Sequence, residues 1–251
     1  MRTTKYLLAA LLLAFSSTVS AREAAPKEAA FQACPQFFAG GVSPRLPNAV
    51  LWTPRALCYD AFAVLHSGTT KTPLFVAERL NRDHLNDAKG EKRTNRFYAD
   101  ARLPRAERAQ LEDYKRSGWS RGHMAPAADM PDAQAMAQSF SLANMVPQAP
   151  VNNQKSWAGI EQATRKYAMR AKGDVYVVTG PVFDDTSTTI GPGKVRVPKY
   201  LYKLVYDATT GRAWAHWIEN TDEARAGRPI SYDELVRRTG IAFLPGITPR
   251  D

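Results

Sequence analysis

The feature that most constrains the fold is one long helical segment that lies between two groups of strand-like runs. Residues 151–172 carry Trp157, Ile160 and Thr164 at helical spacing, and Gly173 follows where a glycine often ends a helix. Runs rich in apolar and aromatic residues lie on both sides, at 61–65, 74–77, 175–179, 200–206 and 212–218. Strands before and after a helix, with short connections, predict one mixed α/β (α+β) domain with a mostly antiparallel central sheet flanked by helices.

Local signals predict three further elements. The first two runs, with the turn-like residues 66–70 between them, predict a hairpin. A short helix is expected near 104–116, and another at 231–240 with Ser231 as its cap.

The first 21 residues have the pattern of a signal peptide. Arg2 and Lys5 give a positive start, residues 6–15 are apolar, and residues 19–21 offer a small-residue cleavage site. The apolar run is too short to cross a bilayer of ~30 Å, so a retained membrane anchor is the less favoured alternative. We therefore expect an exported chain, periplasmic or secreted, that begins near Arg22 and has no membrane segment.

The remaining chain divides into residues 22–56, a leader and loop region, residues 57–245, the folded domain, and the tail 246–251. The only cysteines are Cys34 and Cys58. In an oxidising compartment an isolated pair predicts a disulfide, whose loop closure would stabilise the fold by roughly 3 kcal/mol. Without a Cys-x-x-Cys motif or a Cys/His cluster, a structural zinc site is not expected.

The charge balance is basic. The chain has 34 Lys and Arg against 24 Asp and Glu, a net charge of +10, or +8 once Arg2 and Lys5 are set aside with the leader. Residues 81–117 are especially rich in Arg and Lys. Such a balance suits a polyanionic partner, although basic surfaces also serve solubility. The charge permits a nucleic-acid function without requiring one.

The most informative short motif is Arg121-Gly122-His123. Histidine suits proton abstraction from water at neutral pH, and arginine suits bidentate contact with a phosphate. The glycine between them frees the backbone, so that both side chains can be presented at a bend. Taken alone, the motif more often marks a buried structural histidine in a turn.

A second constellation lies on the predicted helix, where Asn153, Trp157, Glu161 and Arg165 follow at steps of four residues. An amide oxygen near the helix start and a carboxylate two turns later can address one hard cation. Mg²⁺ prefers oxygen ligands and keeps several waters, so one direct protein ligand is acceptable. The alternative is a helix whose Asn152 or Asn153 is only the cap and whose charged side chains are solvated.

Together with Asn144, Pro147 and Gln148, the two constellations resemble the DNA/RNA non-specific endonuclease family, the ββα-metal nucleases. The resemblance extends from about residue 57 to residue 245. One position departs from it: Ser120 stands where the family has an aspartate before Arg-Gly-His. The orientation of His123 must then come from other groups.

The resemblance implies the chemistry of the site. His123 would be the general base, Asn153 would hold one Mg²⁺ or a similar divalent cation such as Mn²⁺, and Glu161 would hold a water of that cation. Activity would then fall below pH ~6.5, where imidazole is protonated. The products would end in 5′-phosphate.

The resemblance also assigns supporting roles. Arg121 and Arg165 would contact phosphate oxygens, and Asn144 and Gln148 would orient the loop and the helix. In the basic stretch, Arg93 and Arg96 would contact the phosphates of the substrate backbone. A solvated loop without a binding role is an equally favoured interpretation of these two arginines.

The other histidines have a simpler interpretation. His66 lies in a turn and His84 in a charged stretch, so both are expected to be solvated, whereas His216 lies in a predicted strand and is expected to be structural.

The predicted function is metal-dependent, sequence-non-specific hydrolysis of DNA and RNA. A non-catalytic nucleic-acid-binding protein on the same scaffold and a phosphodiesterase for small phosphate esters are the alternatives. A homodimer and an inhibitor protein stay open as partners.

Overall fold

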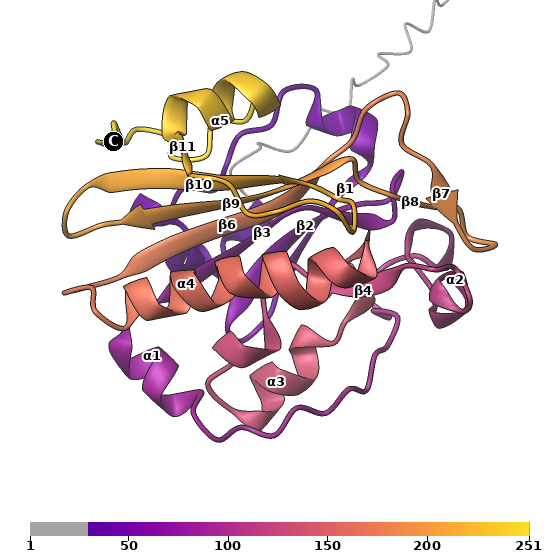
Figure 1. Cartoon of the computed structure of the whole chain (residues 1–251), viewed down its shortest axis with the longest axis horizontal. Coiled ribbons are helices and arrows are strands. Elements are labelled where there is room, and N and C mark those ends of the chain that lie inside the picture. The colour runs from indigo at the N-terminus through magenta and orange to yellow at the C-terminus, as the bar shows by residue number, and fades with distance from the viewer. Residues whose placement is uncertain (1–29, 251) are drawn as a thin grey trace, which may run out of the picture.

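The computed structural model describes residues 30–250, so the predicted signal peptide lies outside them. Within these residues, seven strands form one antiparallel sheet in the order β1-β2-β3-β6-β9-β10-β11 (Figure 1). They are β1 (Pro54–Cys58), β2 (Phe62–Ser67), β3 (Thr72–Leu80), β6 (Val175–Val182), β9 (Tyr200–Asp207), β10 (Arg212–Glu219) and β11 (Ile230–Ser231). Two small pairs lie outside the sheet: β4 (Ser120–His123) with β5 (Met145–Gln148), and β7 (Thr189–Ile190) with β8 (Val195–Arg196).

Helices cover both faces of the sheet. Figure 1 shows α5 on one side and α4, α3 and α1 on the other, with α2 beside the small β4 strand. The helices are α1 (Arg82–Asp87), α2 (Leu111–Tyr114), α3 (Ala133–Ser139), α4 (Ala158–Ala168) and α5 (Tyr232–Thr239). This arrangement confirms the predicted mixed fold.

Strand β9 shows why the sheet is buried on both sides. Successive side chains of a strand point to opposite faces. Tyr202 and Leu204 pack in the core beneath α5, whereas Leu201 packs with Trp157 and Ile160 on the opposite face. All of them are buried, so the sheet forms the middle of a three-layer structure.

Several local predictions are confirmed. The predicted hairpin is β2 and β3, and the three later runs are β6, β9 and β10, each longer than its apolar centre. The Ser231 hydroxyl accepts a hydrogen bond from the Glu234 amide at 3.1 Å, and Gly240 ends α5 in the left-handed conformation.

The region predicted as a leader and loop, residues 22–56, differs from the prediction where it is described. Phe31, Phe37 and Phe38 are buried against Phe75 in the core beneath α5. A disulfide joins Cys34 to Cys58 and ties this segment to β1. Composition did not reveal the packing, because the phenylalanines lie among Pro, Gly and Ala residues without a regular period.

The predicted helices also differ in detail. The helix expected at 151–172 begins as a π-helix, Asn152–Trp157, and α4 ends at Ala168. Neither Asn152 nor Asn153 is the cap: the cap position is Val151, without a capping side chain. The segment 104–116 contains only a 3₁₀ turn, Arg105–Glu107, and the four-residue α2.

The expectation that His66 is solvated was wrong. His66 lies on β2, is fully buried, and its Nε2 atom is 2.8 Å from the Glu107 carbonyl oxygen. Burial lowers its pKa to about 4, although the Glu107 carbonyl favours the protonated form. His84 is half-buried and its Nε2 atom lies 2.7 Å from the Asp129 carbonyl oxygen, so it is not simply solvated either. Among residues 30–250, none of the helices is both long and apolar enough to span a bilayer.

We predict that replacing Cys34 and Cys58 together by serine lowers the free energy of unfolding by about 3 kcal/mol, because the unfolded chain regains the freedom of a closed loop. Urea denaturation followed by circular dichroism measures the change, with the wild type in reducing agent as the control. Two free thiols in the unreduced wild-type protein would contradict the prediction.

Candidate active site

The motif residues come together on a strand pair followed by a helix. In the β4–β5 pair, Gly122 faces Val146 and His123 faces Met145, and the chain then enters the π-helix and α4. Residues about 25 positions apart in the sequence thus share one small unit on the α4 side of the sheet (Figure 1). This strand–strand–helix arrangement carries His123, Arg121 and Asn153.

Gly122 is required by close packing. A Cβ atom on Gly122 would lie 2.7 Å from the Gln148 Cβ and closer still to its Oε1. Its backbone is not in the left-handed region, so the conformational freedom expected from the sequence is not the reason for glycine here. Gln148 is fully buried and donates a hydrogen bond to Asn152 at 2.9 Å, which links β5 to the helix start.

Asn144 forms hydrogen bonds to the loop after His123. Its Oδ1 accepts from the Ala125 amide at 2.8 Å, and its Nδ2 donates to the Ala125 and Ser139 carbonyls at 2.9 Å each. Met124 donates from its backbone to the Asn144 carbonyl at 3.0 Å. The position of the His123 backbone therefore depends on one buried amide.

The His123 ring is held by aromatic packing. Phe140 meets it edge-on with 5.0 Å between ring centroids, and Phe97 lies at 5.9 Å. Nε2 is enclosed and has no hydrogen-bond partner within the described residues. Burial, and then the charges of Arg93 and Arg121, lower the pKa of His123 to about 3. The imidazole is therefore neutral at pH 7.

An open pocket of about 660 Å³ is lined by Arg121, Arg93 and Asn153, and by Phe97, whose ring packs on His123; His123 itself is not among its lining residues. The Arg121 guanidinium stacks over the Phe97 ring at 3.9 Å, and Arg93 donates to Asn95 Oδ1 at 2.7 Å. No ion pair within residues 30–250 involves either arginine. Both cations are free to meet an anion.

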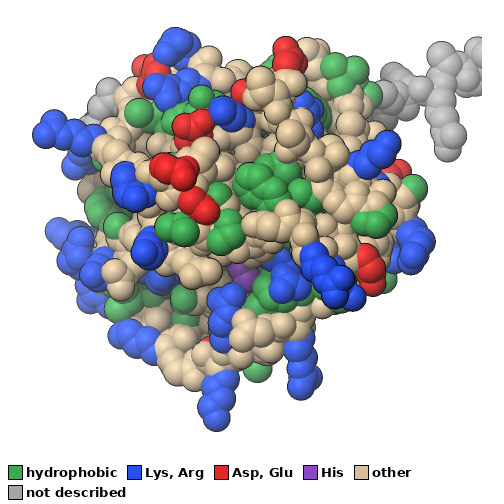
Figure 2. Space-filling model, turned by 45° about the vertical axis from the view of Figure 1, so that its right-hand side comes forward, with side chains coloured by type: hydrophobic (Ala, Val, Ile, Leu, Met, Phe, Trp, Pro, Cys, Tyr) green, Lys and Arg blue, Asp and Glu red, His purple; other side chains and the backbone are tan. Residues whose placement is uncertain are grey.

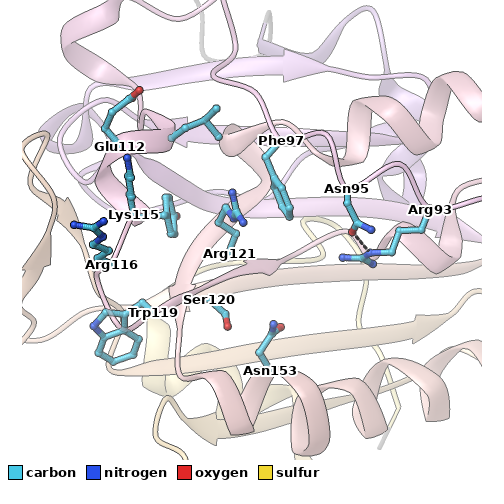
Figure 3. Close-up of a pocket in the computed structure, with 12 residues that line it drawn as sticks. Arg93, Asn95, Phe97, Glu112, Lys115, Arg116, Trp119, Ser120, Arg121 and Asn153 are labelled. Carbon is cyan, nitrogen blue, oxygen red and sulfur yellow. Dashed lines mark hydrogen bonds between the residues drawn. The ribbon is translucent and has the colours of Figure 1, made fainter.

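Figure 3 shows how the pocket residues lie: Arg121 and Phe97 are in the centre, and Ser120 and Asn153 face each other below them. Figure 2 shows Lys and Arg side chains gathered over the lower part of this face, around a hollow in which a histidine is visible. Acidic side chains lie mostly in its upper part. The surface around the hollow is suited to a polyanion.

Behind the pocket, Lys203 and Glu78 are buried, and the partly exposed Glu161 interacts with their charges. Lys203 on β9 donates to Thr179 Oγ1 at 2.7 Å and lies 5.5 Å from the centre of the Trp157 ring. Burial raises the pKa of Glu161 to about 7, against the effect of the Lys203 charge. The two carboxylate oxygens of Glu78 are buried without a hydrogen-bond partner in the described chain, and burial raises the pKa of Glu78 well above its usual range.

Two predicted substrate contacts lie away from the pocket. Arg165 pairs with the buried Asp129, with 2.9 Å between Nη1 and Oδ1, and lines a separate hollow between α1 and α4. Arg96 is exposed and is not among the residues that line the pocket. Trp157, expected in the same stripe as Asn153, is instead fully buried, because the π-helix lies between the two residues.

The donor set fits a hydrated divalent cation. No three His, Cys, Asp or Glu side chains between residues 30 and 250 are grouped to hold a metal. Asn153 offers one half-exposed amide oxygen in the pocket, and Glu161 lies two turns further along the helix. A single protein ligand with water in the other positions suits Mg²⁺.

Comparison with known proteins gives the family. The family model of DNA/RNA non-specific endonucleases matches residues 49–249. The chain belongs to this family. The resemblance drawn from Arg121-Gly122-His123 and the helix residues is thereby confirmed.

Individual relatives agree with the match. A nuclease named "Nuclease EXOG, mitochondrial" from Danio rerio is 39% identical over 165 residues, which are 61% of this chain and 46% of that protein. Human "Endonuclease G, mitochondrial" is 34% identical over 214 residues, 77% of this chain and 68% of that protein. The chain spans about half the length of the EXOG relatives.

A solved structure of an endonuclease G bound to its inhibitor has the same fold. Its TM-score is 0.67 at 22% identity, covering 77% of this chain and 86% of that one.

Sequence reasoning missed the residues that connect the site to the rest of the family fold. Asn220 accepts from the Ala149 amide at 2.9 Å, and Asp222 accepts from the Val151 amide at 2.7 Å. Both lie about 70 positions from the segment they hold, so no local pattern marks them. In the sequence, Lys203 is a single polar residue within an apolar strand, and no local pattern indicates its role.

We predict that Gly122→Ala lowers kcat/KM on DNA by at least ~10-fold, because the new methyl group separates β4 from β5 and misplaces His123. Gln148→Gly alone serves as the control for lost packing. The double variant Gly122→Ala/Gln148→Gly should recover part of the loss, because it also removes the Cβ atom that the new methyl group would meet; a double variant worse than the product of the single effects would contradict the assignment.

We also predict that His123 does not limit activity between pH 5 and 7. Its lowered pKa keeps the imidazole neutral down to about pH 3, so the fall expected below ~6.5 is revised. The measurement is kcat/KM against pH at saturating metal, for the wild type and Glu161→Gln. A fall near pH 6.5 in both proteins would contradict this, whereas a fall in the wild type alone belongs to Glu161.

Proposed function

We propose that the chain is a metal-dependent endonuclease that hydrolyses phosphodiester bonds in DNA and RNA without sequence specificity. The observation that carries the proposal is geometric: the His123 ring, held by Phe97 and Phe140, lies on the same short strand as Arg121. Arg121 lines an open pocket together with Arg93 and the amide of Asn153. Family membership supports the same reaction class.

His123 acts as the general base. Nε2 is the enclosed nitrogen, so Nδ1 accepts a proton from a water molecule. The oxygen of that water attacks the phosphorus atom at the same time. The ring is held by Phe97 and Phe140 rather than by the carboxylate that Ser120 replaces. The bond between phosphorus and the leaving 3′ oxygen then breaks, and the 3′ oxygen takes a proton from water, so the products end in a 5′-phosphate and a 3′-hydroxyl.

Asn153 would hold the divalent cation, Mg²⁺ or Mn²⁺, which when bound would supply Lewis-acid stabilisation of charge at the phosphate. Glu161 orients water around that ion, and its ionised form would be favoured by the added positive charge. Arg121, supported by Phe97, binds a phosphate oxygen. Arg93 holds a neighbouring phosphate.

Lack of sequence preference follows from the contacts. Phosphate-directed arginines and a cation carry no information about bases. A non-catalytic nucleic-acid-binding protein would not need a neutral histidine at the pocket. A phosphodiesterase for small esters would not need the basic surface around it (Figure 2).

We predict that His123→Ala lowers the rate on plasmid, single-stranded DNA and RNA by 10²- to 10⁴-fold, as expected for loss of a positioned base. His216→Ala, a histidine on β10 outside the pocket, is the matched control and should keep wild-type activity. Both variants should keep the wild-type thermal unfolding profile. An H123A protein above a tenth of the wild-type rate would end the assignment.

Asn153→Ala and excess chelator should each abolish cleavage, since one protein ligand holds the cation. Full activity in chelator would refute the metal requirement. Binding without cleavage by the wild type would favour the nucleic-acid-binding alternative, and cleavage of bis(p-nitrophenyl) phosphate alone would favour the small-ester alternative.

We further propose that the protein acts in an oxidising compartment, periplasmic or extracellular, which the Cys34–Cys58 bond supports. The relatives named above are mitochondrial by name, so fractionation of the native host decides the location. A homodimer and an inhibitor protein are partners to test by light scattering and by affinity capture with the purified chain.

A further inference from the structure

The pocket extends beyond the residues of the proposed reaction. Figure 3 shows that one end holds Arg93 and Asn95 and the opposite end holds Trp119, Lys115 and Arg116. The reaction as proposed uses Asn153 and Arg121 in the middle and Arg93 at the first end. The end of the pocket around Trp119 therefore has no role in it.

Trp119 is a half-buried ring in a fixed position. Part of it packs with Tyr114 and Met145 in a small core cluster, and it also lines the pocket. Its backbone amide donates to Ser117 Oγ at 3.1 Å, and Ser117 Oγ donates to the Tyr114 carbonyl at 3.0 Å. Since Ser120 follows directly and begins β4, the indole is placed one residue from the catalytic strand.

The segment that carries this ring is anchored at its other end by Asp113. The Asp113 carboxylate accepts from the Gly193 amide at 2.5 Å and from the Gln110 amide at 2.8 Å. A Cβ atom on Gly193 would lie 2.6 Å from the carboxylate oxygens, so the β7–β8 turn fits closely against α2. The segment 113–119 is thus held by β7–β8 on one side and by β4 on the other.

Two cations stand beside the ring. Lys115 and Arg116 are exposed, and neither forms an ion pair with any residue between 30 and 250. Proteins that bind single-stranded nucleic acid combine aromatic rings, on which bases stack, with basic groups that follow the backbone. The same combination is present here.

We propose that Trp119 forms a stacking subsite for an unpaired nucleobase next to the scissile phosphate, and that Lys115 and Arg116 contact phosphates of the same strand. The proposal rests on the proposed nuclease function and adds a substrate preference to it. In a duplex, both faces of an internal base are covered by its neighbours, so stacking on Trp119 requires an unpaired base. Single-stranded or locally opened substrates are therefore favoured.

Glu112 lines the same end of the pocket (Figure 3). If the phosphates of the strand pass close to the Glu112 carboxylate, the two negative charges repel each other. This repulsion lowers the affinity of the protein for the strand. Removing the Glu112 charge should strengthen binding if the backbone passes this point, and should change nothing if it does not.

The first experiment tests whether the Trp119 ring stacks on one particular base of the substrate. The substrate is single-stranded DNA in which all linkages but one are phosphorothioates, so that cleavage occurs at the single phosphodiester. In a series of such strands, one abasic residue is placed at each of the three positions on either side of that phosphodiester. With the wild type, kcat/KM should fall about 10-fold at one offset, within the 1–3 kcal/mol of a stacked base. On the strand without an abasic residue, Trp119→Leu should lower kcat/KM by about the same factor. An abasic residue at that offset should not lower kcat/KM of Trp119→Leu further, whereas Trp119→Phe should behave like the wild type.

Equal losses for the wild type and Trp119→Leu at every offset would overturn the stacking subsite. Wild-type protein that cuts none of these strands, nor plasmid or RNA, would instead refute the proposed function, so the two failures are distinguishable.

The second experiment tests the phosphate contacts by binding to the inactive His123→Ala protein. Adding Lys115→Ala and Arg116→Ala should lower the slope of log affinity against log salt by about 1.4, at ~0.7 for each phosphate contact on a single strand. Lys172→Ala, an exposed lysine beyond the far end of α4, is the matched control and should leave the slope unchanged. Glu112→Gln should raise affinity two- to threefold, and an unchanged affinity together with an unchanged slope would place the strand elsewhere.

Discussion

The site depends on the contact between Gln148 and Gly122. Antiparallel pairing of β4 and β5 leaves no room for a side chain at position 122, and the Gln148 amide then bonds to Asn152 at the helix start. One buried glutamine thus sets the distance between the strand of His123 and the helix of Asn153. An amide suits this position because it packs as a flat group and still donates a hydrogen bond.

The sheet supports this unit through buried polar groups. Lys203 spans from β9 to Thr179 on β6 and approaches the Met124 carbonyl at 3.5 Å, directly after His123. Its charge lies among Glu78, Asp129 and Glu161, where it compensates carboxylates that would be costly to bury alone. Asn220 and Asp222, which follow β10, hold the helix start by accepting hydrogen bonds from the Ala149 and Val151 amides.

Burial divides the charges between the two sides of the site. The acidic groups Glu78 and Asp129 are buried behind the pocket, whereas Arg93, Arg121 and the cations near Trp119 line it, with Glu112 as the acidic residue of its lining. The same burial keeps His123 neutral, with its pKa lowered to about 3. The site therefore has positive charge at the surface and a neutral imidazole beneath it.

The sequence by itself determined what depends on near neighbours along the chain. The fold class, the Arg121-Gly122-His123 motif and the capped helix at Ser231 could be predicted, since turn, cap and periodic signals act over a few residues. The pairing of Cys34 with Cys58 followed from there being two cysteines. The family resemblance joined the segments without saying how they touch.

Tertiary structure decided what depends on distant neighbours. It turned the start of the long helix into a π-helix, and it buried His66 against a carbonyl 41 positions away. It also paired Arg165 with Asp129 and placed Trp119 at the end of the pocket. These outcomes come from packing and desolvation, whose energies are set by residues far apart in sequence and are absent from any local pattern.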